Sequence, residues 1–209
     1  MIGFILDVVL FSLTNLLFLF SVFGYSSILN GFIFKENLFD NLLFINFIIG
    51  LIFIYIIVGI LFHYFSISNL LTIFIILLGI IFFIKNNYKY FNQLSFFTKY
   101  FKIVLLSVLF GLYALNHNDF DYHLFHILEN KRNNLQYGLA EFGTEYRVAI
   151  NSVWIFLQSI FFIENFHYSL FFLSSIFYSI FIRDFYQLIK NSIIERNYIS
   201  LIDFISSLL

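Results

Sequence analysis

Long runs of apolar residues restrict most strongly what this chain can fold into. One run extends from Leu42 to Phe62 and another from Ser66 to Ile84, and neither contains a charged side chain. A helix of about 20 such residues crosses the ~30 Å hydrocarbon core of a bilayer. Of the 209 residues, 61% are hydrophobic and only 11% are charged, against about 25% charged in soluble domains. The sequence therefore predicts an all-α, multi-pass integral membrane protein.

The residue counts exclude several other classes. Without Cys, the chain can form no disulfide, thiolate metal site or thiol nucleophile. The net charge of −1 argues against nucleic acid as a partner, because nucleic-acid binding needs a basic surface. The 34 Phe and the lack of Pro are typical of AT-rich coding in a bacterium or an organelle. The apolar N-terminus has no basic start and no small-residue cleavage site, which favours a retained span over a signal peptide.

About six transmembrane spans are predicted, roughly at residues 2–23, 42–62, 66–84, 101–115, 149–163 and 168–182. The second and third are separated by a few residues, which predicts an antiparallel helical hairpin. The fourth is short for a bilayer, so we expect it either to draw on the aromatic residues before it or to lie against neighbouring helices.

Four regions follow from these spans: transmembrane helices at 1–115, a polar loop at 116–148, a transmembrane hairpin at 149–182 and an amphipathic segment at 183–209. In the last region, Arg183 and Asp184 are sequence neighbours, which on a helix would not face each other. Residues 204–209 resemble the start of another apolar element, which indicates a truncated chain.

A short basic segment sets the predicted orientation. It contains Lys85, Lys89, Lys99 and Lys102 and no acidic residue. The positive-inside rule places it in the cytoplasm and the loop at 116–148 outside. We expect the bacterial inner membrane.

The start of that loop holds the densest group of reactive side chains. Two carboxylates and three imidazoles fall between residues 117 and 126, and on a helix Asp119, His123 and His126 share one face while Asp121 lies on another. Such a face could bind a divalent cation or pair a general base with its orienting group. The simpler alternative is a solvated loop in which Asp caps a helix start.

A second group opens the fifth predicted span. Arg147 lies one helical turn before Asn151, so both can face the same way. Arginine binds phosphate or carboxylate through its planar fork. An interfacial arginine that reaches the lipid headgroups is the competing interpretation.

These motifs carry a resemblance. Asp121-Tyr122-His123 and the Arg-x3-Asn-Ser-x-Trp pattern from Arg147 to Trp154 resemble the N-terminal part of a poorly characterised bacterial family of multi-pass membrane proteins. That family is similar in layout to GT-C-type glycosyltransferases of envelope glycan assembly. This chain departs from its pattern at Tyr137, where the family has Pro, and at residues 141–145, which form a longer and different insert. Relatives are also considerably longer.

The resemblance implies a polyprenyl-phosphate sugar donor and chemistry at the outer membrane face. Asp119 or Asp121 would deprotonate the acceptor hydroxyl or bind a divalent cation, with His123 and His126 assisting. Arg147 would hold the donor phosphate, with Asn151 beside it.

Two other functions are weighed against this one. The small size and AT-driven composition also suit a non-catalytic structural subunit of a membrane complex, such as an organelle-encoded respiratory component with partner subunits. Transport ranks third, because few charges lie within the predicted spans and no Gly/Pro-broken helix marks a midplane site.

Overall fold

The computed structural model describes residues 2–33, 43–62, 64–91, 94–114, 124, 127–128, 130–132, 153–164 and 167–195. Its elements are α1 (Ile2–Ile33), α2 (Leu43–Phe62), α3 (Asn69–Asn87), η1 (Tyr88–Tyr90), α4 (Leu94–Ala114), α7 (Val153–Phe161), η3 (His167–Phe171) and α8 (Phe172–Glu195). All of these elements are helical, which confirms the predicted all-α class.

Three stretches are long and apolar enough to cross a membrane: Ile5–Gly31, Leu43–Phe62 and Asn69–Tyr90. They agree with the first three predicted spans and support an integral membrane protein. The other three spans stay predictions. The α4 helix begins at Leu94 and thus includes the aromatic residues before Phe101, as expected. The α7 helix has 9 residues, which corresponds to about 14 Å of helix.

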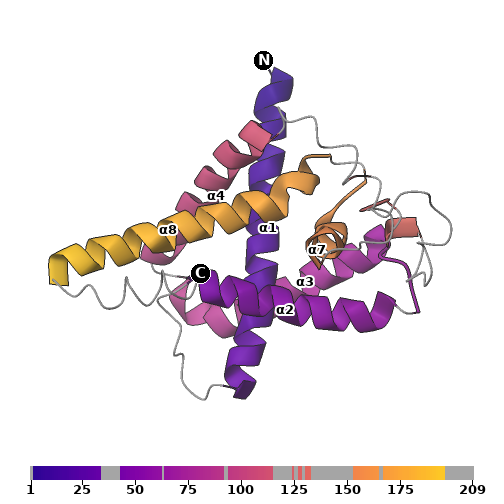
Figure 1. Ribbon diagram of the computed structural model, residues 1–209, viewed down its shortest axis with the longest axis horizontal. Helices are drawn as coiled ribbons and strands as arrows, with labels where there is room; N and C mark the ends of the chain where they lie inside the picture. The colour runs from indigo at the N-terminus through magenta and orange to yellow at the C-terminus, as the bar shows by residue number, and fades with distance from the viewer. Residues whose placement is uncertain are drawn as a thin grey trace.

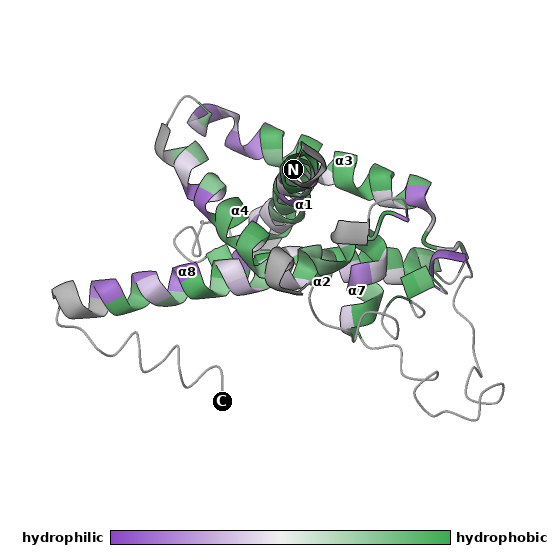
Figure 2. Ribbon diagram, turned by 90° about the horizontal axis from the view of Figure 1, so that it is seen from above, coloured by the Kyte–Doolittle hydropathy of each residue, from purple (hydrophilic) through white to green (hydrophobic). Residues whose placement is uncertain are grey.

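The outward surface of these helices is apolar. Leu70 exposes 81% of its surface, and large apolar side chains continue along α3 at Phe74, Leu77 and Ile81, three or four residues apart. This spacing places them on one helix face. Figure 2 shows hydrophobic residues along most of α1, α2 and α3. Contiguous exposed apolar surface of this kind indicates contact with lipid.

The α1 helix is the centre of the packing. Figure 1 shows it upright through the molecule, with α2 and α8 running across it. Gly24 of α1 lies against Gly79 of α3, and Gly50 of α2 lies against the backbone of Val22, each so closely that a Cβ would collide. Small residues permit such close approach between membrane helices. Consequently α2 and α3 pack chiefly against α1, and not on each other as the predicted hairpin implied.

Aromatic rings fill the space where α1, α3 and α4 meet. Phe83 stacks on Phe20 with 4.5 Å between ring centroids and meets the edge of Tyr100 at 5.7 Å. A second group joins Phe18 to Phe172 at 4.2 Å. Each such pair contributes about 0.5–1.5 kcal/mol beyond its buried area. The many Phe residues, whatever their codon origin, therefore form the core.

Two polar side chains of α1 form hydrogen bonds to neighbouring helices. The Asn15 amide donates to the Ser107 hydroxyl over 2.9 Å, and the Tyr25 hydroxyl donates to the carbonyl of Ile75 over 2.9 Å. An unpaired polar group is expensive in lipid, so these bonds also tie α1 to α4 and α3.

The α8 helix is continuous past the predicted boundary between the hairpin and the amphipathic segment, ending at Glu195. Near its middle Arg183 and Asp184 form an ion pair. The prediction that these neighbours would not meet was wrong, because the long arginine side chain can fold back along the helix.

Candidate functional site

The six predicted site residues lie outside the described residues: Asp119, Asp121, His123, His126, Arg147 and Asn151. Among the residues that are described, no group of three or more His, Cys, Asp and Glu side chains could hold a metal ion. A divalent cation at the loop stays a prediction. Trp154, the described residue of the second motif, packs edge-on against Phe177 at 5.7 Å, inside the bundle.

The residues directly after the acid- and imidazole-rich stretch are docked onto the helices. Ile127 is completely buried and belongs to a small apolar cluster with Ile155, Phe162 and Leu170. These three residues belong to α7, to the turn after it and to η3. Burying one isoleucine side chain contributes about 1.5–3 kcal/mol. This end of the loop is thus part of the packed structure.

Asn130 adds polar contacts to two neighbouring segments. Its carbonyl accepts the N–H of Ile67 over 3.1 Å, and its side-chain amide donates to the hydroxyl of Ser159 over 2.9 Å. Ile67 lies in the turn before α3, whose first turn is capped by the Ser68 hydroxyl. Asn130 therefore links the loop both to the start of α3 and to α7.

Lys131 completes this arrangement with a buried amine. Its side chain donates to the Thr72 hydroxyl over 2.6 Å and to the Asn69 side-chain oxygen over 3.4 Å, and the residue is only 4% exposed. We call Asn69, Thr72, Asn130, Lys131 and Ser159 the loop clasp. A buried ammonium group is stable only when hydrogen bonds replace its water, which the clasp supplies.

Burial also changes the acidity of this amine. It lowers the pKa of Lys131 from 10.5 to about 8, against the opposing charge of Glu164. The amine therefore remains mostly protonated at neutral pH and can donate the two hydrogen bonds of the clasp.

The clasp lies close in the sequence to the candidate residues. The α4 helix ends at Ala114, and the chain is docked at Ile127. The predicted carboxylates and imidazoles between residues 117 and 126 lie between these two points in the sequence.

The sequence motifs did not point to Lys131 or to the clasp. One signal was present: Leu124, Ile127, Leu128 and Lys131 are spaced as i, i+3, i+4 and i+7. This spacing places the lysine on the apolar face of a helix. A charged residue on such a face indicates that its charged group has a buried hydrogen-bonding partner.

No family model, curated protein or solved structure matches this chain. The resemblance to GT-C-type proteins therefore stays a prediction from the motifs.

Proposed function

We propose that this integral membrane protein uses the loop at 116–148 as a catalytic face for a lipid-linked substrate, in the manner of a GT-C-type glycosyltransferase of the bacterial inner membrane. The observation that carries the proposal is the loop clasp. It docks the chain next to the Asp and His residues onto α3 and α7.

The proposed reaction transfers a sugar from a polyprenyl-phosphate donor to a hydroxyl acceptor. The acceptor oxygen forms a bond to the anomeric carbon, and the bond from that carbon to the phosphate oxygen breaks. Asp119 or Asp121 takes the hydroxyl proton, with His123 and His126 assisting. The electron pair leaves with the polyprenyl phosphate, whose charge Arg147, beside Asn151, or a divalent cation stabilises.

The test is the double substitution Asp119→Asn and Asp121→Asn in a host in which the natural gene is replaced. Asn keeps the size and hydrogen bonding of the side chain but cannot accept the proton. We expect the envelope glycans made by the host to change as they do on deletion of the gene. Asp203→Asn, a matched substitution distant from the loop in the sequence, should leave them unchanged.

Unchanged glycans in the double variant would contradict the proposal, provided that the variant is inserted in the membrane at the normal level. They would favour the structural-subunit interpretation, in which the loop contacts partner membrane subunits.

A further inference from the structure

A second polar site lies at the opposite end of α3. A cavity of about 550 Å³ opens where the end of α1, the start of α2, the end of α3 and the start of α4 meet. Its volume is within the range of about 300–1,000 Å³ that is typical of small-molecule sites. From Thr72 to Asn86 along α3 the distance is about 21 Å, so this cavity and the loop clasp are separate.

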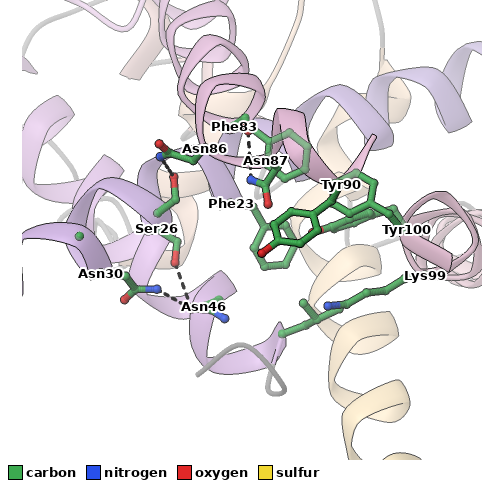
Figure 3. A pocket seen from close by; sticks show the side chains of 14 residues that line it. Phe23, Ser26, Asn30, Asn46, Phe83, Asn86, Asn87, Tyr90, Lys99 and Tyr100 are labelled. Atoms are coloured by element: carbon green, nitrogen blue, oxygen red, sulfur yellow. Dashed lines mark hydrogen bonds between the residues drawn. The ribbon is translucent and has the colours of Figure 1, made fainter. Parts of the chain in front are cut away.

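One side of the cavity consists of amides and hydroxyls. Asn30 and Ser26 of α1 both donate to the side-chain oxygen of Asn46, over 2.8 and 3.4 Å, and Asn86 donates to the Ser27 hydroxyl over 2.6 Å. Figure 3 shows this group together, with dashed hydrogen bonds. The bonds hold the amide planes in fixed orientations. Amides and hydroxyls both donate and accept hydrogen bonds, and the hydroxyl groups of a ligand do the same.

The other side is aromatic and carries a positive charge. Tyr90 and Tyr100 line it with Phe23 and Phe83, and the Lys99 side chain extends from this side toward the amides. Flat aromatic faces suit the C–H face of a sugar or polyol. The ammonium group of Lys99 supplies a partner for an anion, for which phosphate is a common match.

Among the described residues, Asp184 is an acidic neighbour of this site. Its carboxylate accepts the N–H of Phe44 over 2.7 Å and is paired with Arg183, while the charge of Lys99 also acts on it. Lys85, Lys89 and Lys102 lie on the adjoining helices, where residues 85–102 include no acid. The segment from Lys85 to Lys102 is thus positive.

We propose that this cavity binds the head of an anionic membrane lipid that carries both a phosphate and free hydroxyl groups. The amide side would bind the hydroxyls, and Lys99 would bind the phosphate. A lipid is favoured over a soluble sugar phosphate because the cavity lies where the three long apolar stretches end: Gly31, Leu43 and Tyr90 line it, and each is a terminal residue of one stretch. Acyl chains can therefore extend along these apolar helices while the head occupies the cavity.

The experiment is a lipid titration of the purified, delipidated full chain in detergent, read by native mass spectrometry. The probes are phosphatidylglycerol, with phosphate and hydroxyls; phosphatidic acid, with phosphate alone; a neutral galactolipid, with hydroxyls alone; and phosphatidylcholine. We expect phosphatidylglycerol to bind about tenfold more tightly than each of the others, because each of them lacks either the net negative charge or the free hydroxyls.

Matched variants assign the binding to the cavity. Lys99→Gln should lower the affinity for phosphatidylglycerol about tenfold, whereas Lys102→Gln, an exposed lysine one turn away, measures only diffuse attraction to anionic lipid. Asn86→Ala, at an exposed position, should reduce the preference for phosphatidylglycerol over phosphatidic acid. The Asp119→Asn, Asp121→Asn double variant should bind as the unmodified chain does, which separates this site from the proposed reaction.

Three results would overturn the proposal. Equal binding of phosphatidylglycerol and phosphatidic acid would show that the amide side does not bind the lipid hydroxyls. Equal effects of Lys99→Gln and Lys102→Gln would reduce the binding to general surface charge. Displacement of the lipid by equimolar glycerol 3-phosphate would make the ligand a soluble one.

Discussion

The two ends of α3 use the same residue types for different purposes. At the first end, Asn69 and Thr72 surround the amine of Lys131, which the chain itself supplies, and the space is filled. At the last end, Asn86 and Asn87 also face a lysine, Lys99, but there the structure leaves a cavity of about 550 Å³. The first end is a closed structural joint, and the second is open to a ligand.

This contrast shows that polarity alone does not identify a binding site in a membrane protein. Buried polar groups must be paired, and the chain can pair them internally. A site for another molecule is recognised where the polar groups are already oriented by hydrogen bonds and space remains beside them. The predictions below test how independent the two ends are, beginning with the largest effect.

The first prediction concerns the contact that holds α3 in place. A Cβ at Gly79 would lie 2.6 Å from the carbonyl oxygen and 2.8 Å from the Cα of Ser21. Gly79→Leu should therefore force α3 away from α1 and disrupt both ends together, since backbone atoms cannot move aside as a side chain can. We expect loss of monodisperse protein in size-exclusion chromatography. Gly59→Leu is the matched control, because a Cβ there meets nothing within 4 Å.

A normal elution profile for Gly79→Leu would contradict the close packing of α1 on α3. If the Gly59→Leu variant also aggregates, the added leucine itself causes the loss of monodisperse protein, and its position at Gly79 does not.

The second prediction isolates the closed end. Because the folded pKa of Lys131 is about 8 and its ordinary value is 10.5, the unfolded chain holds more protons between these values. Stability should thus rise with pH across this window, by on the order of 3 kcal/mol, and be flat with respect to this group below it. The measurement is the free energy of unfolding in detergent between pH 7.5 and 10.5.

Lys131→Met should remove this increase, since it keeps the length of the side chain without a titrating amine. Lys89→Met, at an exposed lysine, should retain it. An unchanged slope in the Lys131 variant would mean that the amine is not buried as the clasp requires.

The sequence was sufficient to predict α2 and α3. The run at 42–62 corresponds to α2 at Leu43–Phe62, and the run at 66–84 to α3 at Asn69–Asn87. Both depend on local composition, because a continuous apolar stretch in lipid must satisfy its own backbone as a helix. That the candidate loop residues, including Asp119 and Arg147, form a functional site remains a prediction.

Helix pairing and the cavity could not be predicted in this way. The hairpin of α2 and α3 was expected from the short connection, but contacts of Gly24 and Gly50 bring α1 against both. The cavity combines Asn30, Asn46 and Asn86, which are far apart in the chain and individually ordinary. Only the tertiary arrangement gives them a common function.

The third and smallest predicted effect concerns a hydrogen bond next to the open end. Asp184 accepts the N–H of Phe44 in the first turn of α2, where backbone donors have no partner within the helix. Asp184→Ala should lower the free energy of unfolding by about 1 kcal/mol, the usual contribution of an N-terminal cap, and Asp184→Asn should recover most of it because asparagine caps as well as aspartate. Chemical denaturation of the two variants measures the difference, and the pH slope due to Lys131 should persist in both if the ends are independent.

If asparagine proves as destabilising as alanine, the carboxylate acts through its charge on Arg183 and Lys99 and not as a cap. Asp184 would then belong to the electrostatics of the cavity, and the open end would be more tightly coupled to α8 than the closed end is.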